Sequence, residues 1–230
     1  MSTIERNFEA LARRIDNACR AAGRERSAVT LIGASKTMGT EQLEAAAALG
    51  LKDFGENYLE EALVKIQALV SPATWHFIGR IQSNKTRQMA AAFDWIHTVD
   101  RVKVAHRLAA QCPPEKRLNV LIQVNLDDDP AKAGANAVDA AAVLDAIAGE
   151  PTLIARGLMT ILARATDPVA GYESVAQLHT SLASRLSPEL RQQWNALSMG
   201  MTADLEAAIA AGATHIRIGT ALFGARLPRD

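Results

Sequence analysis

The sequence predicts one α/β domain, a single (β/α)8 TIM barrel over residues 1–230 with an extra helix at its N-terminal end. Two observations support this expectation: the chain contains eight apolar, strand-like runs, and helix-like segments alternate with them. Strands that alternate with helices favour parallel pairing, and eight such repeats in 230 residues are typical of a closed barrel. An open doubly wound sheet is the alternative, although no G-x-G-x-x-G turn follows a strand to support its dinucleotide-binding form.

Hydrophobic periodicity assigns the elements in order. Residues 1–23 predict an N-terminal helix packed on the barrel, because Phe8, Leu11 and Ile15 recur at helical spacing and Gly23 ends the pattern. The expected strands are Val29–Lys36, Lys52–Asn57, Thr74–Gly79, Trp95–Val99, Asn119–Asn125, Ile154–Ile161, Trp194–Ser198 and His215–Gly219. The expected helices between them are Thr40–Leu49, Tyr58–Leu69, Asn84–Phe93, Arg101–Gln111, Asn136–Ala148, Val169–Leu186 and Ala203–Ala211.

The composition narrows the class of partner. Hydrophobic residues make up 49% of the chain and aromatic residues 4%, which predicts a core of small aliphatic side chains. Lys+Arg and Asp+Glu are 25 each, so no net charge favours nucleic acid or a membrane surface. The two cysteines and the scattered histidines form no metal-binding motif, and no signal peptide or membrane segment is evident. We expect a cytoplasmic monomer with a small-molecule partner.

Lys36 is the first candidate for chemistry. It closes the apolar run from Val29, so it should emerge at the C-terminal end of a buried strand, where α/β barrels place their active sites. An amine in a partly dry cavity gives up its proton more easily, and the neutral amine can form a Schiff base. The alternative is a strand-end lysine that extends its ammonium into water.

The loops after the seventh and eighth strands predict an anion site. They contain Ser198, Gly200 and Met201 in the first, and Gly219 and Thr220 in the second. Glycines let backbone amides approach a phosphate, hydroxyl groups donate hydrogen bonds, and the helix that follows favours negative charge. In barrels of this type these two loops often bind phosphate. The alternative is that they only cap helices.

Polar residues of other strands are expected at the same rim. Arg217 alternates with two isoleucines, so it should point into the barrel mouth, toward a ligand or toward an inward carboxylate such as Glu56. Asn57 ends the second strand and can orient a ligand or cap the next helix. His76 is expected to be a packed histidine.

These segments together resemble the pyridoxal phosphate homeostasis protein family, whose barrel is similar to that of alanine racemase. The resemblance runs from about residue 29 to 226, and it is specific because many motifs occur in order. The motifs are Ala34-Ser35-Lys36-Thr37, Phe54-Gly55-Glu56-Asn57, His76-Phe77-Ile78-Gly79, Gln82-Ser83-Asn84-Lys85, Gln123-Val124-Asn125, Gly157-Leu158-Met159, Leu197-Ser198-Met199-Gly200-Met201 and Arg217-Ile218-Gly219-Thr220.

The resemblance implies that Lys36 holds pyridoxal 5′-phosphate (PLP) as a Schiff base, that the two glycine-containing loops bind its phosphate, and that Arg217 faces the pyridine nitrogen. The cofactor-binding residues that it implies are Lys36, Asn57, Met159, Ser198, Gly200, Met201, Arg217, Gly219 and Thr220. It also implies a role in vitamin B6 homeostasis, with apo PLP-dependent enzymes as transient recipients and without an established reaction.

Two further hypotheses remain open. A weak racemase would use Lys36 as one base, with water or Tyr58 as the other, although the racemases take a tyrosine from an additional β domain that has no counterpart here. An arginine at the ring nitrogen also disfavours carbanion chemistry, because it cannot give that nitrogen a proton. The third hypothesis is a Schiff-base aldolase that acts on a phosphorylated sugar without a cofactor.

The chain departs from the family pattern at two places. Met38 and Gly39 follow Lys36-Thr37 where the family usually has Lys-Pro, which removes a second lysine that could relay the cofactor. A glutamate common in the family is replaced in the loop over residues 127–132.

Overall fold

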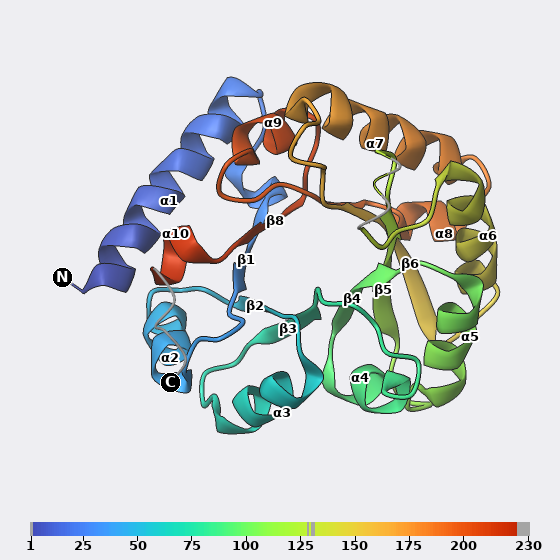
Figure 1. The fold of residues 1–230 in the computed structure, drawn as a ribbon, viewed down its shortest axis with the longest axis horizontal. Coiled ribbons are helices and arrows are strands. Elements are labelled where there is room, and N and C mark those ends of the chain that lie inside the picture. The colour runs from blue at the N-terminus through green and yellow to red at the C-terminus, as the bar shows by residue number, and fades with distance from the viewer. Residues whose placement is uncertain (1, 128, 130–131, 225–230) are drawn as a thin grey trace.

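A computed structural model describes residues 2–127, 129 and 132–224 as a closed barrel of eight parallel strands in sequence order (Figure 1). Each strand pairs with the next, and the pairing of β8 with β1 closes the barrel. The strands are β1 Thr30–Ala34, β2 Asp53–Glu56, β3 Thr74–Phe77, β4 Trp95–Val99, β5 Leu118–Val124, β6 Leu153–Thr160, β7 Ala196–Ser198 and β8 His215–Ile218. The predicted TIM barrel is confirmed.

Helices surround the barrel and follow the strands along the chain (Figure 1). The α-helices are α1 Thr3–Ala21, α2 Thr40–Ala48, α3 Leu59–Ala68, α4 Thr86–Ala92, α5 Val102–Gln111, α6 Ala137–Ala148, α7 Pro168–Ala183, α8 Pro188–Gln193, α9 Leu205–Ala210 and α10 Thr220–Phe223, and a 3-10 helix, η1, covers Arg26–Ala28. The expected helix over 169–186 ends at Ala183 instead. A separate helix, α8, then begins because Ser187 caps it and Pro188 occupies its first turn.

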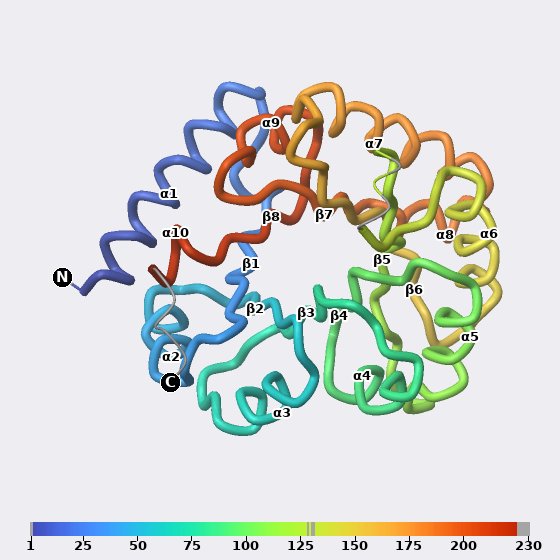
Figure 2. The backbone as a smooth tube through the Cα atoms, in the orientation of Figure 1, coloured from blue at the N-terminus to red at the C-terminus, as the bar shows by residue number. Residues whose placement is uncertain are grey.

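Helix α1 is the extra N-terminal helix, and it packs on the outside of the barrel. Ser2 and Glu5 form a capping box at its start, while Leu11 and Ile15 are buried on its inner face. The tube drawing shows α1 running beside α9 and α10, which it contacts (Figure 2). The side-chain amide of Asn7 donates to the carbonyl oxygen of Leu222 at 3.1 Å, so α1 is tied to the segment that follows β8.

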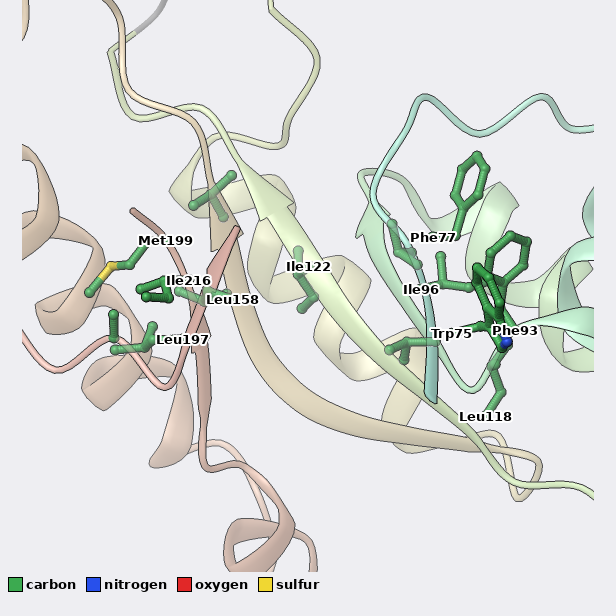
Figure 3. Close-up of a cluster of buried hydrophobic side chains, with 14 of the residues drawn as sticks. Trp75, Phe77, Phe93, Ile96, Leu118, Ile122, Leu158, Leu197, Met199 and Ile216 are labelled. Atoms are coloured by element: carbon green, nitrogen blue, oxygen red, sulfur yellow. The ribbon is translucent and has the colours of Figure 1, made fainter. Parts of the chain in front are cut away.

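The main apolar core lies between the strands and the helices (Figure 3). On β3 and β4, for example, Phe77 and Ile96 are buried in this layer, with Phe93 edge-on against Phe77. The barrel interior is different. Among the described residues it contains a small apolar cluster around Leu121, Met159 and Ala196, and several buried polar side chains lie beside that cluster.

Some expectations lie partly outside the described residues. Of the substituted loop over 127–132, residues 128, 130 and 131 are not described, and neither are residues 225–230. Within the described ranges, no helix combines the length and the hydropathy that crossing a membrane requires. The same residues contain no cluster of three or more His, Cys, Asp or Glu side chains suited to a metal ion.

Candidate functional site

A pocket of about 330 Å³ opens at the C-terminal ends of the strands. Six of the predicted cofactor-binding residues line it, although they come from four different parts of the chain. These six are Lys36, Asn57, Met201, Arg217, Gly219 and Thr220. Its other lining residues, which are not among the predicted cofactor-binding residues, are Ala34, Ile78, Ile161, Thr202 and Ala203.

The other three predicted cofactor-binding residues do not line the pocket. Met159 is buried in the apolar cluster inside the barrel, at 1% exposure. Ser198 is fully buried, and its hydroxyl group is hydrogen-bonded within the barrel rather than directed at the pocket. Gly200 has a φ of +95°, and a Cβ there would lie 2.6 Å from the Cβ of Ala208, so this glycine is required by the turn. In this structure the Ser198 hydroxyl group contacts His97 and Arg217 inside the barrel, so its binding to a ligand phosphate stays a prediction.

Lys36 lies just after β1 and lines the pocket. Its side chain is half-buried, and Nζ has no hydrogen bond or ion pair with any residue that the structure describes. Lys65, on α3, is the opposite case: it is buried, and its Nζ donates to Ser35 O, Glu56 Oε1 and Glu61 Oε1. Lys36 is therefore the lysine that is available to a ligand in this pocket.

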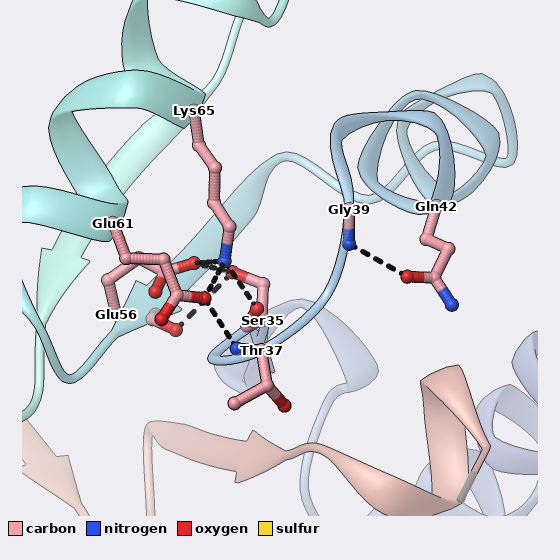
Figure 4. Close-up of polar contacts among 8 residues, drawn as sticks. Ser35, Thr37, Gly39, Gln42, Glu56, Glu61 and Lys65 are labelled. Atoms are coloured by element: carbon pink, nitrogen blue, oxygen red, sulfur yellow. Dashed lines mark hydrogen bonds and ion pairs between the residues drawn. The ribbon is translucent and has the colours of Figure 1, made fainter. Parts of the chain in front are cut away.

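The loop that carries Lys36 is held from α3 (Figure 4). Lys65 Nζ donates to the carbonyl oxygen of Ser35 at 2.6 Å, on one side of Lys36. On the other side, the backbone N–H of Thr37 donates to Glu61 Oε1 at 2.5 Å. Thr37 has a φ of 67°, which is costly for a β-branched residue, so these contacts offset local strain of about 1–3 kcal/mol. The pair Glu61 and Lys65, four residues apart on a helix, was the signal in the sequence that could have revealed this network.

Glu56 belongs to this network and not to the barrel mouth. Side chains alternate along β2, so Asn57 faces the pocket while Glu56 faces α3, where it accepts from Lys65 at 2.7 Å and from the Ser35 hydroxyl at 2.6 Å. The alternative in which Arg217 pairs with Glu56 is therefore wrong. Burial raises the pKa of Glu56, and the hydrogen bonds from Lys65 and Ser35 act in the opposite direction.

Arg217 is 5% exposed and forms the floor of the pocket on β8. Nη1 donates to the hydroxyl oxygen of Ser198 at 2.7 Å, and Nη2 donates to the carbonyl oxygen of Thr160 at 2.8 Å. Burial lowers the pKa of Arg217 to about 10, which leaves the guanidinium charged at neutral pH. Its remaining N–H groups can donate to a ligand atom that accepts a hydrogen bond.

Asn57 offers the pocket a buried polar atom. Its Oδ1 is buried without a hydrogen-bond partner in the described structure, and it does not cap α3, whose N-cap is Tyr58. A buried acceptor without a partner is costly, so this oxygen is suited to receive a donor from a ligand or from an ordered water.

The part of the pocket wall formed by Gly219 and Thr220 suits an anion. Gly219 is the N-cap of α10 and Thr220 its first residue, and the first amides of a helix have no acceptor within that helix. A Cβ on Gly219 would lie 3.2 Å from the carbonyl oxygen of Ala34, so a larger residue would crowd β1. Thr220 adds a hydroxyl group to the same wall.

Neither tyrosine lines the pocket. Tyr58 is 58% exposed and borders a neighbouring hollow with Glu60 and Lys85. Tyr172 is 1% exposed, and burial, together with nearby Asp204, raises the pKa of its phenol. The expectation that Tyr58 can act as a second base in the same cavity as Lys36 finds no support in this arrangement.

Residues 6–227 match the family model of the alanine racemase N-terminal domain. The pyridoxal phosphate homeostasis protein of Pseudomonas aeruginosa is 47% identical over 228 residues, which cover 98% of this chain and 97% of that protein. The protein of the same name from Escherichia coli is 40% identical over 233 residues, with 98% of each chain covered.

Solved structures agree with these relatives. PipY of Synechococcus elongatus, in the structure with PLP bound, is 36% identical with a TM-score of 0.78, over 86% of this chain and 93% of that chain. Alanine racemase of Corynebacterium glutamicum is 16% identical with a TM-score of 0.64, over 94% of this chain and 61% of that chain, and it shows the fold alone. The chain therefore belongs to the pyridoxal phosphate homeostasis protein family.

Proposed function

We propose that this protein binds PLP as a Schiff base on Lys36 and acts in intracellular PLP homeostasis as a carrier, without catalytic turnover. The observation that carries the proposal is the pocket that joins Lys36, whose Nζ has no partner among the described residues, to Arg217 and to the start of α10. The names of the relatives and the PLP-bound PipY structure support the choice of ligand.

The residues of the pocket fit the cofactor. Lys36 supplies an amine for the aldehyde, and Gly219 and Thr220 supply amides and a hydroxyl group for the phosphate. Asn57 Oδ1, which is buried without a partner in the described structure, can accept from the phenolic hydroxyl or from water beside it. PLP, when bound, would supply an aldehyde that exchanges between amines and a ring that can withdraw electrons.

Arg217 supports a role without turnover. Its guanidinium is anchored by Ser198 and by Thr160, so it can donate to an unprotonated ring nitrogen but does not provide that nitrogen with a proton. A ring without that proton withdraws electrons weakly, and carbanion chemistry on a bound amino acid is correspondingly slow.

The experiment that tests the carrier role is cofactor transfer. The PLP-loaded protein is mixed with an apo PLP-dependent enzyme, and the activity of that enzyme is followed while a scavenger of free PLP is present. We expect activation that depends on the amount of loaded protein, and activation that is lost with the Lys36→Ala variant. If neither transfer nor sequestration occurs at any ratio, the carrier role is wrong. If the protein takes up no PLP at all, the Schiff-base aldolase becomes the better hypothesis.

A weak racemase activity requires a separate test. Exchange of the α-proton of an amino acid with solvent deuterium needs only one base, which Lys36 could provide. We expect no exchange above the rate of PLP alone, because Tyr58 borders a different hollow and the pKa of Tyr172 is raised by burial. Exchange that is lost in Lys36→Ala would show that the protein has enzymatic activity, and the proposal of a carrier without turnover would be wrong.

We further propose that the protein works as a monomer in the cytoplasm and meets recipient enzymes transiently. The replacement of the usual Lys-Pro by Met38 and Gly39 removes one lysine near the pocket, so release from Lys36 would not pass through a lysine at position 38. Met38 is buried, and the N–H of Gly39 donates to Gln42 at the start of α2 (Figure 4).

A further inference from the structure

Five side chains inside the barrel, those of Asp53, His76, His97, Ser198 and Arg217, form a continuous chain of hydrogen bonds, which we call the file. Asp53 Oδ1 lies 2.9 Å from His76 Nε2, and His76 Nδ1 lies 2.9 Å from His97 Nε2. His97 Nδ1 lies 2.8 Å from Ser198 Oγ, and Arg217 Nη1 donates to the same oxygen at 2.7 Å. The members come from β2, β3, β4, β7 and β8, so the file crosses the interior of the barrel.

The file connects the N-terminal ends of the strands with the pocket. Asp53 is the first residue of β2, and its side chain is 24% exposed. Asn57, which lines the pocket, follows Asp53 by four residues, and a strand of that length separates the two residues by about 13 Å. The intermediate members His76, His97 and Ser198 are each fully buried.

With both imidazoles neutral, the two ends of the file determine the direction of every hydrogen bond in it. Arg217 can only donate, so Ser198 Oγ accepts from it and keeps its own hydrogen for His97 Nδ1. An ionised Asp53 can only accept, so the proton of His76 lies on Nε2. His76 Nδ1 is then left to accept from His97 Nε2–H, and two neutral imidazoles provide one hydrogen for each contact.

The surroundings of His97 favour its neutral imidazole. Burial lowers the pKa of His97, and the nearby His76, His215 and Arg217 lower it further. The third histidine of this cluster, His215, contacts the rings of His76 and His97 but hydrogen-bonds to Thr214 instead. It is therefore outside the file.

We propose that Asp53, His76, His97 and Ser198 are positioning residues that hold Arg217 toward the pocket. This inference rests on the proposed function, because Arg217 faces the ring of PLP only if PLP is the ligand. The carboxylate of Asp53 sets both histidines in the Nε2–H form. His97 then accepts from the Ser198 hydroxyl, and a lone pair of Ser198 stays directed at Arg217 Nη1. The free N–H groups of the Arg217 guanidinium are thereby kept in one orientation. Asp53, which sets this orientation, lies at the other end of the file.

The first test needs no variant and no cofactor. Nitrogen-15 NMR of the imidazoles in the full-length protein at neutral pH distinguishes the two neutral tautomers from the charged form. We expect His76 and His97 to carry their proton on Nε2. If either ring is an imidazolium or carries its proton on Nδ1, the proposed direction of the file is wrong.

The second test measures whether substitutions at distant members of the file have coupled effects on PLP affinity. Asp53→Ala and Ser198→Ala should each raise the dissociation constant for PLP by about fivefold, and the double variant should be within about twofold of Ser198→Ala, because the two residues act through one file. Asp94→Ala is the matched control. Asp94 directly precedes β4, as Asp53 begins β2, but its carboxylate accepts from the backbone N–H of Trp75 and is not part of the file. It should leave PLP binding and the histidine tautomers unchanged.

Additive effects of Asp53→Ala and Ser198→Ala would overturn the proposal, as would an effect of Asp94→Ala equal to that of Asp53→Ala. Failure of the proposed function has a different signature: the wild-type protein would bind no PLP, while the histidine tautomers would still report on the file. If Asp53→Ala does not fold, the tautomers of the wild-type protein still decide the question.

Discussion

Lys36 is half-buried in the pocket and Lys65 is buried on α3, and their surroundings give them different roles. Lys65 donates to two carboxylates and a carbonyl oxygen, whereas Lys36 Nζ has no partner within the described residues. Removal of one partner from a buried ion pair lowers the free energy of unfolding, because the other charge is left buried without a counter-charge. A lysine whose Nζ has no such partner is available to a ligand.

This difference predicts opposite results for two variants. Lys36→Ala should abolish covalent binding of PLP while changing the free energy of unfolding by no more than about 0.5 kcal/mol. Lys65→Met should lower that free energy by about 3–5 kcal/mol, because Glu56 and Glu61 lose their counter-charge. Urea denaturation of the two apo variants measures both values. Equal destabilisation by the two substitutions would contradict the assigned roles.

The buried histidines predict an acid-sensitive fold. Burial lowers the pKa of His215 to about 3 and that of His179 to about 4, and it also lowers the pKa of His97. The unfolded chain binds these protons near pH 6.5, so the stability contributed by the neutral rings is present above that pH and is lost as the pH falls toward the folded-state values. Each ring contributes a slope of at most about 1.4 kcal/mol per pH unit.

Urea denaturation between about pH 7 and about pH 5 measures this slope. His215→Gln should reduce it by roughly the contribution of one proton. His106→Gln is the comparison variant, because the His106 side chain is 56% exposed and does not belong to the group of buried rings. A slope that is the same in His215→Gln as in the wild type would show that His215 takes up its proton in the folded state.

At the scale of elements, α3 holds the loop that carries Lys36. Glu61 accepts from the backbone N–H of Thr37 and from Lys65, while its neighbour Glu60 pairs with Lys85 on the surface. Glu61→Ala should therefore weaken PLP binding by about tenfold, because the strained Thr37 loses its acceptor and Lys36 becomes less well placed. Absorbance titration with PLP measures the effect. Glu60→Ala is the matched control and should change the affinity by less than about twofold; equal losses in both variants would contradict the role of α3.

The sequence predicts the elements well where periodicity is strong, and less well where contacts are distant. Lys36 is predictable because it follows an apolar strand, and Arg217 is predictable because it alternates with isoleucines along a strand. The inward direction of Ser198 and the outward direction of Glu56 depend on strand register, which one residue of displacement reverses. The histidine file joins β2, β3, β4, β7 and β8, and no local pattern reveals contacts between strands so far apart in the chain.

For the whole molecule, closure of the barrel brings the two halves of the site together. Lys36 follows β1 and Arg217 lies on β8, 181 positions later in the chain, yet β1 and β8 are paired neighbours. Helix α1 covers this closing seam and contacts α9 and α10, so it braces the elements next to the pocket (Figure 2). The closed barrel thus places the two halves of the site next to each other before a cofactor binds.

The central claim is that Lys36 carries the cofactor, and covalent trapping tests it most directly. The protein is loaded with PLP, reduced with borohydride, digested and mapped by mass spectrometry, with Lys65→Met and Lys36→Ala treated in parallel. We expect a single phosphopyridoxyl group on Lys36 in the wild type and none in Lys36→Ala. A label on a different lysine, or a reduced protein without any label, would contradict the account.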